Sequence, residues 1–234
     1  MMQFLKPMLR DLRRSIGSGR RPALNDIDRK LEHHLGPGPG FFVEAGANDG
    51  YQQSNTYYLE ATRGWRGLLV EGIPELYEKC RRLRKRATVV NCALVAPTYD
   101  RPTVTMHYAH LMSVVDGAMK SPEAQGRHLS LGREVQGLTK AYSIEVPART
   151  LESVLEQVPD LPPIDLLSLD VEGYELNVLE GMNLARFSPR FILVEARFFD
   201  DIDALLSPRY ELVDRLSHHD CLYRRRDSAP APAA

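Results

Sequence analysis

From residue 41 onward, strand-length apolar runs alternate with segments of helical period, and this alternation constrains the fold more than any other feature of the chain. Strands that alternate with helices form a parallel sheet with the helices packed against it. The chain is therefore expected to be an α/β protein. The expected elements of the first half, a βαβαβ unit, are 41–45, 54–62, 67–71, 74–84 and 88–94.

The second half repeats the pattern and then closes with a hairpin. The expected elements are strands at 164–170 and 191–195, helices at 174–181 and 201–206, and two last strand-like runs at 210–216 and 221–225. The last two runs are expected to pair antiparallel. Together these runs predict a Rossmann-like, doubly wound, mostly parallel seven-stranded sheet with an antiparallel last strand.

Three stretches stand outside this alternation. Glycine and proline alternate over 35–40 and mark a hinge, so residues 1–36 are interpreted as an N-terminal helical extension, with an amphipathic helix at 1–14, and 37–226 as the main domain. Residues 95–147 interrupt the pattern, with strand-like pieces at 103–108 and 142–146 around a polar loop. They are predicted to form an inserted hairpin and mobile lid. The Pro- and Ala-rich tail, 227–234, is predicted to be disordered.

Composition excludes several classes of protein. The formal net charge is −1, and no apolar run approaches the roughly 20 residues that a membrane span needs. Three cysteines without a C-x-x-C pair predict neither a disulfide framework nor a zinc site, and favour a reducing, cytoplasmic location. The basic run at 81–86 falls where a helix should end, so we interpret it as a response to the helix dipole and expect no nucleic-acid partner.

The turn after the first strand, EAGANDG at 44–50, indicates a nucleotide-like cofactor. Ligands of open parallel sheets bind beyond the carboxyl ends of the strands, where glycines let backbone N–H groups approach them. Ser54 is expected to cap the next helix, whose N-terminus would face an anionic group. The dinucleotide pattern G-x-G-x-x-G is absent, since Asn48 and Asp49 precede Gly50. An acidic turn suits a sulfonium amino acid better than a pyrophosphate.

Carboxylates end three other strands of the predicted sheet. Glu71 follows the second strand, where an acid can accept hydrogen bonds from both hydroxyls of a ribose. Asp170 and Glu172 flank one residue at another strand end and would point to the same side if the strand conformation continued. Glu195 ends the next strand and is expected to lie nearby. These acids form a dense negative group at the mouth of the sheet.

Four segments carry a resemblance to a known family. They are VEAGANDG at 43–50, SNTYYLE at 54–60, GWRGLLVE at 64–71 and IDLLSLDVEGYE at 164–175. In order and spacing they resemble the FkbM-type methyltransferases, S-adenosylmethionine-dependent enzymes of the class I methyltransferase fold. The resemblance runs from about residue 41 to about residue 216. The family usually has Pro-Asn or Pro-Asp after the ribose-binding acid, whereas this chain has Gly72 and Ile73 before Pro74.

The resemblance implies a binding site for S-adenosylmethionine. The 44–50 turn and the helix start at 54–56 would hold its methionine part, Glu71 its ribose, and Cys92 and Ala93 would border its adenine. Asp170 would face the site of methyl transfer. The residues expected to bind the cofactor are Glu44, Gly46, Ala47, Asn48, Gly50, Ser54, Asn55, Thr56, Glu71, Cys92, Ala93 and Asp170.

The expected reaction is O-methylation of a sugar or a small natural-product-type acceptor. An alcohol needs a general base or a metal that lowers its pKa before it attacks a methyl carbon. Asp170 is the expected base, helped by Glu172 and Glu195, and with Glu172 it is also a candidate Mg²⁺ ligand. His107, His110 and His128 are alternative bases in the predicted lid.

Two other classes of function stay open at this point. An NAD-linked oxidoreductase shares the sheet and the ribose acid but needs the missing glycine pattern. A non-catalytic cofactor-binding scaffold would keep the pocket, and only the acidic cluster argues against it. The expected partner is a small-molecule or sugar acceptor, and a homo-oligomer is left open.

Overall fold

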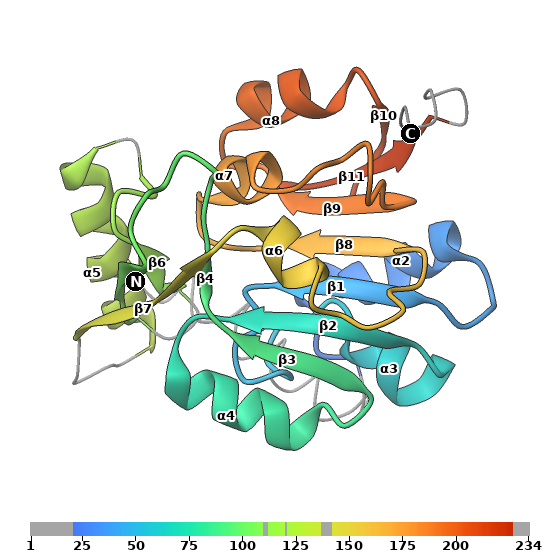
Figure 1. The fold of residues 1–234 in the computed structure, drawn as a ribbon, viewed down its shortest axis with the longest axis horizontal. Coiled ribbons are helices and arrows are strands. Elements are labelled where there is room, and N and C mark those ends of the chain that lie inside the picture. The colour runs from blue at the N-terminus through green and yellow to red at the C-terminus, as the bar shows by residue number, and fades with distance from the viewer. Residues whose placement is uncertain (1–20, 110–111, 120, 137–141, 227–234) are drawn as a thin grey trace.

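The computed structural model describes residues 21–109, 112–119, 121–136 and 142–226, which form two sheets flanked by helices (Figure 1). The expectations for a helix at 1–14 and a disordered tail at 227–234 lie outside the described residues. None of the described helices combines the length and apolarity that a membrane span requires.

The main sheet has the seven strands that the sequence predicts. They are β1 (Phe41–Ala45), β2 (Arg66–Glu71), β3 (Ala87–Asn91), β8 (Leu166–Leu169), β9 (Phe191–Glu195), β10 (Tyr210–Arg215) and β11 (Asp220–Arg225). Their order is β10-β11-β9-β8-β1-β2-β3, and β11 runs antiparallel to both of its neighbours while the other pairs are parallel. The α/β class and the antiparallel last strand are thus confirmed.

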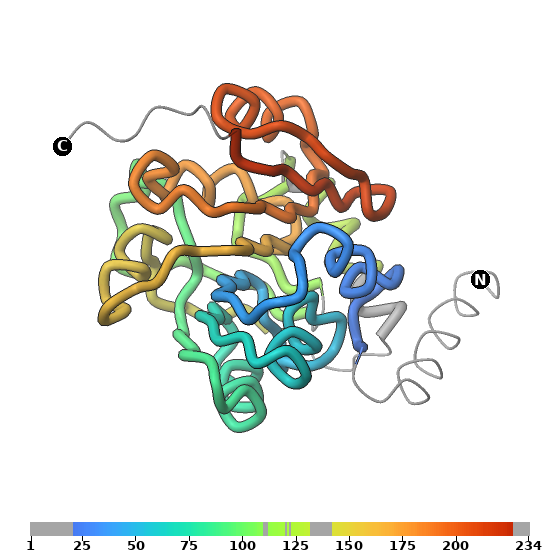
Figure 2. Tube along the Cα trace, turned by 90° about the vertical axis from the view of Figure 1, so that its right-hand side faces the viewer, coloured from blue at the N-terminus to red at the C-terminus, as the bar shows by residue number. Residues whose placement is uncertain are grey.

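Strand β1 lies in the middle of this sheet, between β8 and β2. Figure 2, seen toward the amino ends of the parallel strands, shows the blue N-terminal part of the chain between the orange and the teal segments. The strand order reverses around β1, because the chain moves outward to β3 on one side and later to β9 on the other. A crevice forms at such a reversal, beyond the carboxyl ends of the strands.

Each face of the main sheet is covered by its own helices. On one face, α6 (Leu151–Leu155), α7 (Glu175–Glu180) and α8 (Phe199–Leu206) pack on a core that includes Val43 and Leu167. The other face carries α2 (Ile27–Leu35) and α3 (Tyr57–Arg63) on a core that includes Phe42. Phe42 and Val43 are adjacent in β1 and point to opposite faces, as the two-residue period of a strand requires. Helix α4 (Pro74–Leu83) follows β2 and packs against β2 and β3.

Helix α2 belongs to the core although the sequence assigns it to an extension. It follows a short 3₁₀ turn, η1 (Leu24–Asp26), and buries Ile27, Leu31 and Leu35, which are 3%, 0% and 5% exposed. These residues recur every four positions and so share one face of the helix. They pack in one cluster with Trp65 and Phe42.

The segment inserted between β3 and α6 forms a second, smaller sheet. Its strands are β4 (Ala93–Leu94), β5 (Thr103–His107), β6 (Val114–Val115) and β7 (Ser143–Arg149), in the order β4-β7-β5-β6. β5 and β7 pair antiparallel, which confirms the hairpin expected from 103–108 and 142–146. In Figure 1 the parallel strands of the main sheet point toward this insert. The insert therefore lies at the edge of the sheet where ligands bind.

Two helices of this region differ from the sequence-based expectation. Residues 122–136, predicted to be part of a polar loop, form α5 (Pro122–Gln136), which has Pro at its first position and is rich in good helix formers. Two glycines within it weaken the helical signal. Helix α6 has only five residues, too few to show a period, and begins where the Thr150 side chain accepts a hydrogen bond from the Ser153 amide at 3.2 Å.

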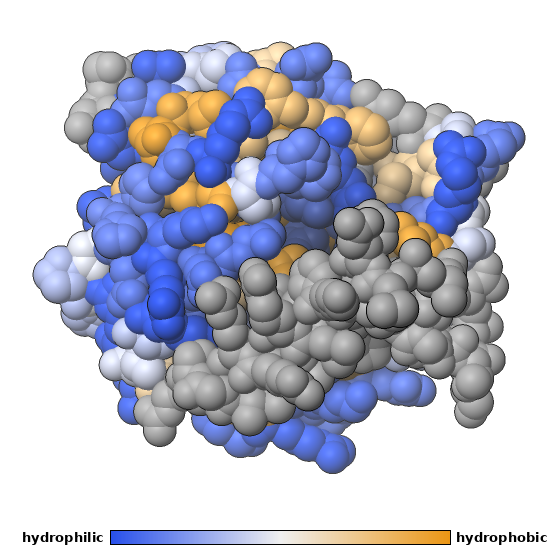
Figure 3. Space-filling model, turned by 180° about the vertical axis from the view of Figure 1, so that it is seen from behind, coloured by the Kyte–Doolittle hydropathy of each residue, from blue (hydrophilic) through white to orange (hydrophobic). Residues whose placement is uncertain are grey.

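The exposed surface carries no continuous apolar face among the parts that can be described. The large apolar side chains that stay exposed, Leu24, Leu83, Leu131 and Leu212, come from different elements. In Figure 3 the apolar patches on the visible face are interrupted by hydrophilic side chains. Isolated exposed apolar residues of this kind are normal in globular proteins.

Candidate active site

Two neighbouring cavities lie at the carboxyl ends of the main-sheet strands, and the first of them also meets the insert. The first, about 590 Å³ including the open space at its mouth, is lined by Gly46, Glu71 and Asp170 of the main sheet and by Met106 and Val115 of the insert. The second, about 400 Å³ measured in the same way, extends along residues 52–55. Ala45, Gly46, Asn48 and Asp170 line both cavities. The two cavities are therefore direct neighbours.

Gly46 is required by the close approach of two strand ends. It has a left-handed φ of 81°, and a Cβ there would lie 1.8 Å from the carbonyl oxygen of Asp170. Its N–H and that of Ala47 both donate to the Val70 carbonyl at 3.1 Å. The expectation that glycine N–H groups of this turn face a ligand is thus wrong for Gly46. Gly50 is likewise required by lack of space, since a Cβ there would lie 2.9 Å from Arg84 Cγ and from Cys80 Sγ.

Glu44 anchors the start of α3. Its buried carboxylate accepts hydrogen bonds from the Ser54 hydroxyl at 3.0 Å, the Asn55 amide at 3.0 Å and the Thr56 hydroxyl at 2.6 Å. Helix α3 begins at Tyr57, and the Thr56 side chain makes no capping hydrogen bond. The Ser54 hydroxyl still accepts from the Tyr57 amide at 3.1 Å.

Glu71 lies in the wall of the first cavity, as predicted. One carboxylate oxygen accepts from the Asn48 amide at 2.7 Å and the other from the Ile73 amide at 2.8 Å. Burial raises the pKa of Glu71 to about 7. Each oxygen of a carboxylate has two acceptor positions, so both can take a further hydrogen bond. Cys92 and Ala93, at the break between β3 and β4, line the same cavity.

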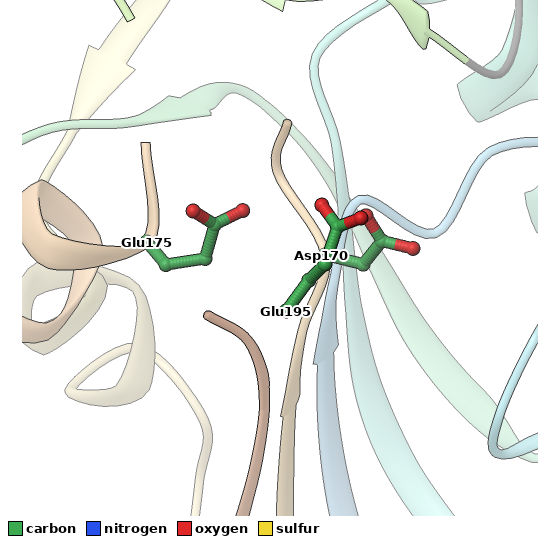
Figure 4. Close-up of side chains that lie close together, drawn as sticks. All are labelled: Asp170, Glu175 and Glu195. Carbon is green, nitrogen blue, oxygen red and sulfur yellow. The ribbon is translucent and has the colours of Figure 1, made fainter. Parts of the chain in front are cut away.

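The acids at the end of β8 do not continue the strand. β8 ends at Leu169, and Glu172 and Gly173 have left-handed φ values of 57° and 97°. The alternation that would have placed Asp170 and Glu172 on one side is therefore broken. The residues that come together are instead Asp170, Glu175 and Glu195, which place one carboxylate oxygen each within 4.8 Å of one another (Figure 4).

Arg197 and backbone amides hold three of the four acids. Arg197 binds Glu172 through Nη2 at 2.5 Å and Glu195 through Nε at 2.9 Å. Glu175 accepts hydrogen bonds from the Val171 amide at 3.0 Å and the Gly173 amide at 3.1 Å. The charge of Arg197 and the loop that follows β8 are thus committed to fixing these side chains.

Asp170 is the exception within this cluster. In the described part of the chain its carboxylate has no hydrogen-bond or ion-pair partner, and it lines both cavities. Burial, and then the charges of Glu195, Glu172 and Glu175, raise the pKa of Asp170 well above its ordinary value. Burial and Glu195 also raise the pKa of Glu172 to about 8. Asp170 is therefore the carboxylate that is free to act on a ligand.

The histidines of the insert differ in which residues they contact. His128 of α5 lies 3.5 Å from a Glu172 oxygen and 3.1 Å from the Met112 carbonyl, and burial followed by Arg197 lowers its pKa. His107 bonds to Ser143 at 2.8 Å and Asp116 at 3.1 Å, within the insert. His110 lies outside the described residues. Of these candidates, His128 alone is shown in contact with the acidic cluster.

The predicted site residues are only partly brought together. Those that line the first cavity are Gly46, Asn48, Glu71, Cys92, Ala93, Asp170 and Glu172. Those that line the second are Glu44, Gly46, Asn48, Ser54, Asn55 and Asp170. Ala47, Gly50, Thr56 and Glu195 line neither of the two. The sequence-based reasoning did not find Glu175, Arg197 or Met106, although Arg197 follows Glu195 by two residues and is a cation among acids.

Of the seven non-glycine residues with a positive φ in the described part of the chain, three line the cavities. Asn48, Gln53 and Glu172 line them and have φ values of 50°, 59° and 57°, which side chains other than glycine seldom adopt. Such conformations cost about 1–3 kcal/mol each and cluster at ligand sites. Their position supports the assignment of these cavities as the functional site.

A family model described as the methyltransferase FkbM domain matches residues 44–224. The comparison with curated proteins finds no match. A solved structure of an FkbM methyltransferase from Methylobacillus flagellatus KT is similar with a TM-score of 0.47 and 17% identity, over 80% of this chain and 43% of that one.

Two further solved structures have similar scores. A TehB-like SAM-dependent methyltransferase from Corynebacterium glutamicum ATCC 13032 is 11% identical, with a TM-score of 0.45, over 97% of this chain and 100% of that one. Fibrillarin from Aeropyrum pernix, described with natively bound S-adenosyl-L-methionine, is 14% identical, with a TM-score of 0.42, over 82% and 68%. The chain thus spans less than half of the Methylobacillus protein and most of the other two.

Proposed function

Because the chain belongs to the FkbM methyltransferase family, we propose that it transfers a methyl group from S-adenosylmethionine to a hydroxyl of a sugar or a small natural-product-type acceptor. The observation that carries the proposal is Asp170, an unpaired carboxylate that lines two neighbouring cavities beyond the carboxyl ends of the strands. The acceptor class rests on the need of a hydroxyl for such a base.

The residues around the cavities fit this cofactor. Glu71 offers both oxygens to the ribose hydroxyls, with Cys92 and Ala93 at the end proposed for the adenine. In the second cavity, the side-chain oxygen of Asn55 is proposed to receive the amino-acid part, and the Asn55 side chain is fixed by a 3.2 Å bond to the Ser168 hydroxyl. The Ser54 hydroxyl lines the same cavity but is already bonded to Glu44, Tyr57 and Arg84. S-adenosylmethionine supplies an electrophilic methyl group on a sulfonium cation, and the acidic surroundings favour that charge.

Asp170 is proposed as the general base. The acceptor oxygen gives its proton to this carboxylate as its new bond to the methyl carbon forms and the carbon–sulfur bond breaks. A carboxylate with a raised pKa is a stronger base than an ordinary one. The free energy of proton transfer from the acceptor hydroxyl to Asp170 is therefore less unfavourable. Burial, and then the charge of Glu195, keep that pKa high, while Arg197 fixes the positions of Glu195 and Glu172. Alignment of the reacting atoms supplies a large part of the remaining rate.

A magnesium ion at Asp170 is the weaker proposal. The three oxygens within 4.8 Å belong to Asp170, Glu175 and Glu195, so the predicted ligand Glu172 is not among them. Glu195 is already bound by Arg197, and Glu175 by two amides. A divalent cation would have to compete with the guanidinium beside it. The donor set therefore fits a proton acceptor better than a metal.

Ligand-dependent thermal stability tests the cofactor class. S-adenosylhomocysteine at 100 times its dissociation constant should stabilise the fold by about 2.7 kcal/mol, or roughly 5–10 °C in melting temperature. NAD and MgCl₂ are the comparison ligands, each added alone and with S-adenosylhomocysteine. A rise in melting temperature with NAD alone would favour an oxidoreductase and contradict the proposal. A rise with S-adenosylhomocysteine that occurs only when Mg²⁺ is present would support a magnesium site.

Asp170→Asn separates binding from chemistry. Loss of the base should lower the rate at which S-adenosylhomocysteine is formed by about 10²–10⁴-fold. This rate is measured with a panel of hydroxylated acceptors. Affinity for S-adenosylhomocysteine should stay within about threefold, since the change is isosteric. Glu211→Gln on β10, far along the sheet, is the matched control. A mutant that keeps its turnover would exclude Asp170 as the base, and a wild-type protein that binds cofactor without any turnover would favour a scaffold.

A further inference from the structure

Met106, near the end of β5, is one of the residues through which the insert lines the first cavity. Its backbone pairs with Val115 of β6 on one side and with Ile144 of β7 on the other. Its side chain is 8% exposed, belongs to the core cluster beneath the insert, and lines the cavity. Pairing on both sides fixes where the side chain begins, and packing in the core cluster beneath the insert restricts where its thioether can lie.

The thioether of Met106 occupies space that Gly72 leaves open. A Cβ on Gly72 would lie 2.2 Å from Sδ of Met106 and 3.1 Å from its Cε. The backbone of Gly72 is outside the left-handed region, so any residue could adopt it, and the glycine is required for room alone. This contact joins the insert to the main domain at the residue that follows Glu71.

The same contact lies at the end of the cavity that we assign to the base of the cofactor. A Cβ on Gly72 would lie 3.6 Å from the carbonyl oxygen of Cys92, so Gly72, Met106 and Cys92 meet at one corner. Glu71, the proposed ribose acid, is the next residue in the chain. Glu71, Gly72, Cys92 and Met106 line the same cavity, so a nucleoside bound to Glu71 by its diol has Met106 within the walls around it.

We infer that Met106 is a specificity-determining residue: seated over Gly72, its thioether closes the purine end of the cofactor cavity and sets the size of base that the cavity accepts. This inference rests on the proposed function. A thioether is flexible and polarisable and packs well against aromatic rings, but it hydrogen-bonds only weakly. Met106 therefore selects the base by shape and excludes purines that carry a bulky substituent.

Met106→Ala tests the inference by opening this corner. Affinities are measured by titration calorimetry on the full chain with S-adenosylhomocysteine and with its N6-benzyl derivative. The wild type should bind the parent compound and bind the N6-benzyl derivative at least 100-fold more weakly. Met106→Ala should narrow that ratio at least tenfold. Met182→Ala is the matched control, because Met182 is equally buried but lines neither cavity, and it should leave the ratio unchanged.

Gly72→Ala makes the opposite change. The new methyl group would displace the Met106 thioether into the cavity that it lines, so affinity for S-adenosylhomocysteine should fall at least tenfold while the fold is retained. The double variant Gly72→Ala, Met106→Ala should regain affinity to within threefold of Met106→Ala alone. Gly126→Ala on α5, where a Cβ meets nothing within 4 Å, should have no effect.

The outcomes separate the inference from the proposed function. If the wild type binds S-adenosylhomocysteine but Met106→Ala leaves the ratio unchanged, the inference is overturned and the function stands. If the wild type does not bind S-adenosylhomocysteine, both fail. Where Met106→Ala does not fold, the Gly72→Ala result decides: unchanged affinity overturns the inference, and a loss of affinity supports it.

Discussion

Arg84 is a buried cation that holds together three separate parts of the main domain. It is 1% exposed and lies at the end of α4. Its guanidinium reaches Glu60 at 2.6 Å, the Thr56 hydroxyl at 2.8 Å and the Gly50 carbonyl at 3.1 Å. Every donor it offers in these contacts meets an oxygen near the start of α3, next to the second cavity. The Arg84 side chain thereby fixes the segment beside the second cavity.

Arg84→Met should be strongly destabilising. The change leaves Glu44 and Glu60 buried without their cation, and removal of one partner of a buried pair costs about 3–5 kcal/mol. Urea denaturation measures the free energy of unfolding. Arg82→Met, an exposed change on the same helix, should cost less than about 0.5 kcal/mol. Equal stability of the two variants would show that Arg84 does not hold the site.

Asp28 of α2 gives stability a pH dependence. It is 1% exposed, neither carboxylate oxygen has a hydrogen-bond partner in the described part of the chain, and burial raises its pKa from 3.8 to about 6. The folded state therefore binds more protons than the unfolded state between these two values. Stability falls as the pH rises through this window, and the full penalty applies above pH 6.

Asp28→Asn should remove that penalty. The variant should gain about 1–3 kcal/mol in unfolding free energy at pH 7.5 and much less at pH 4, because a shift of one pKa unit corresponds to about 1.4 kcal/mol. Denaturation curves at the two pH values measure the difference. Asp100→Asn, an exposed loop change, is the control. A gain that is equal at both pH values would show that titration of Asp28 is not its cause.

Among the elements, the sequence could predict the seven strands of the main sheet and the helices that follow β1, β2, β8 and β9. Strands such as β1 and β9 read as short, continuous apolar runs between turn residues, which is the pattern of a central parallel strand. Helices α5 and α6 could not be predicted in the same way, because glycines interrupt one and the other is shorter than two turns. The turn after β8 was misplaced since nothing in the sequence marks Leu169, rather than Asp170, as the last strand residue.

The residues of the candidate site also divide into those that could be predicted from the sequence and those that could not. Gly46, Glu71 and Asp170 could be placed because the rule for parallel sheets brings strand ends to one edge, whatever the side chains do. Arg197, His128 and Met106 could not, because their roles depend on contacts between elements that are far apart in the sequence. Met106, for example, lines the cavity only because β5 is held between β6 and β7.

Helix α2 yields a prediction at the level of the element. Leu31 is fully buried at the centre of the contact between this helix and the sheet. Leu31→Ala should lower the free energy of unfolding by about 2–5 kcal/mol, the range for a buried leucine. Arg29→Ala, on the exposed side of the helix, should change it by less than about 0.5 kcal/mol. A small effect of Leu31→Ala would mean that α2 is an appendage, as the 1–36 extension implies.

In the molecule as a whole, the site belongs to neither sheet alone. The main sheet supplies Gly46, Glu71 and Asp170, and the insert supplies Met106 and Val115 as the opposite wall. A ligand in the first cavity therefore contacts two bodies of structure that are otherwise joined through the core cluster beneath the insert. Such a ligand should lower the frequency with which the insert opens.

Hydrogen exchange measures this coupling. With saturating S-adenosylhomocysteine, amide exchange in β5 and β6 should slow at least tenfold, because opening then requires release of the ligand. The hairpin of β10 and β11, which lines neither cavity, should change little. Protection confined to the main-sheet turns, with no change in the insert, would show that the insert does not close the cavity.

Gly46 has a consequence for how proteins of this kind are traced through evolution. Its lack of a side chain is demanded by the Asp170 carbonyl, 1.8 Å from where a Cβ would lie, and its N–H is satisfied within the sheet. A descendant that had abandoned the cofactor would still have to keep this glycine in order to fold. The presence of this glycine in a related sequence therefore indicates the same fold and not activity. Loss of activity should first be visible as a substitution of Asp170, because nothing in the sheet requires its free carboxylate.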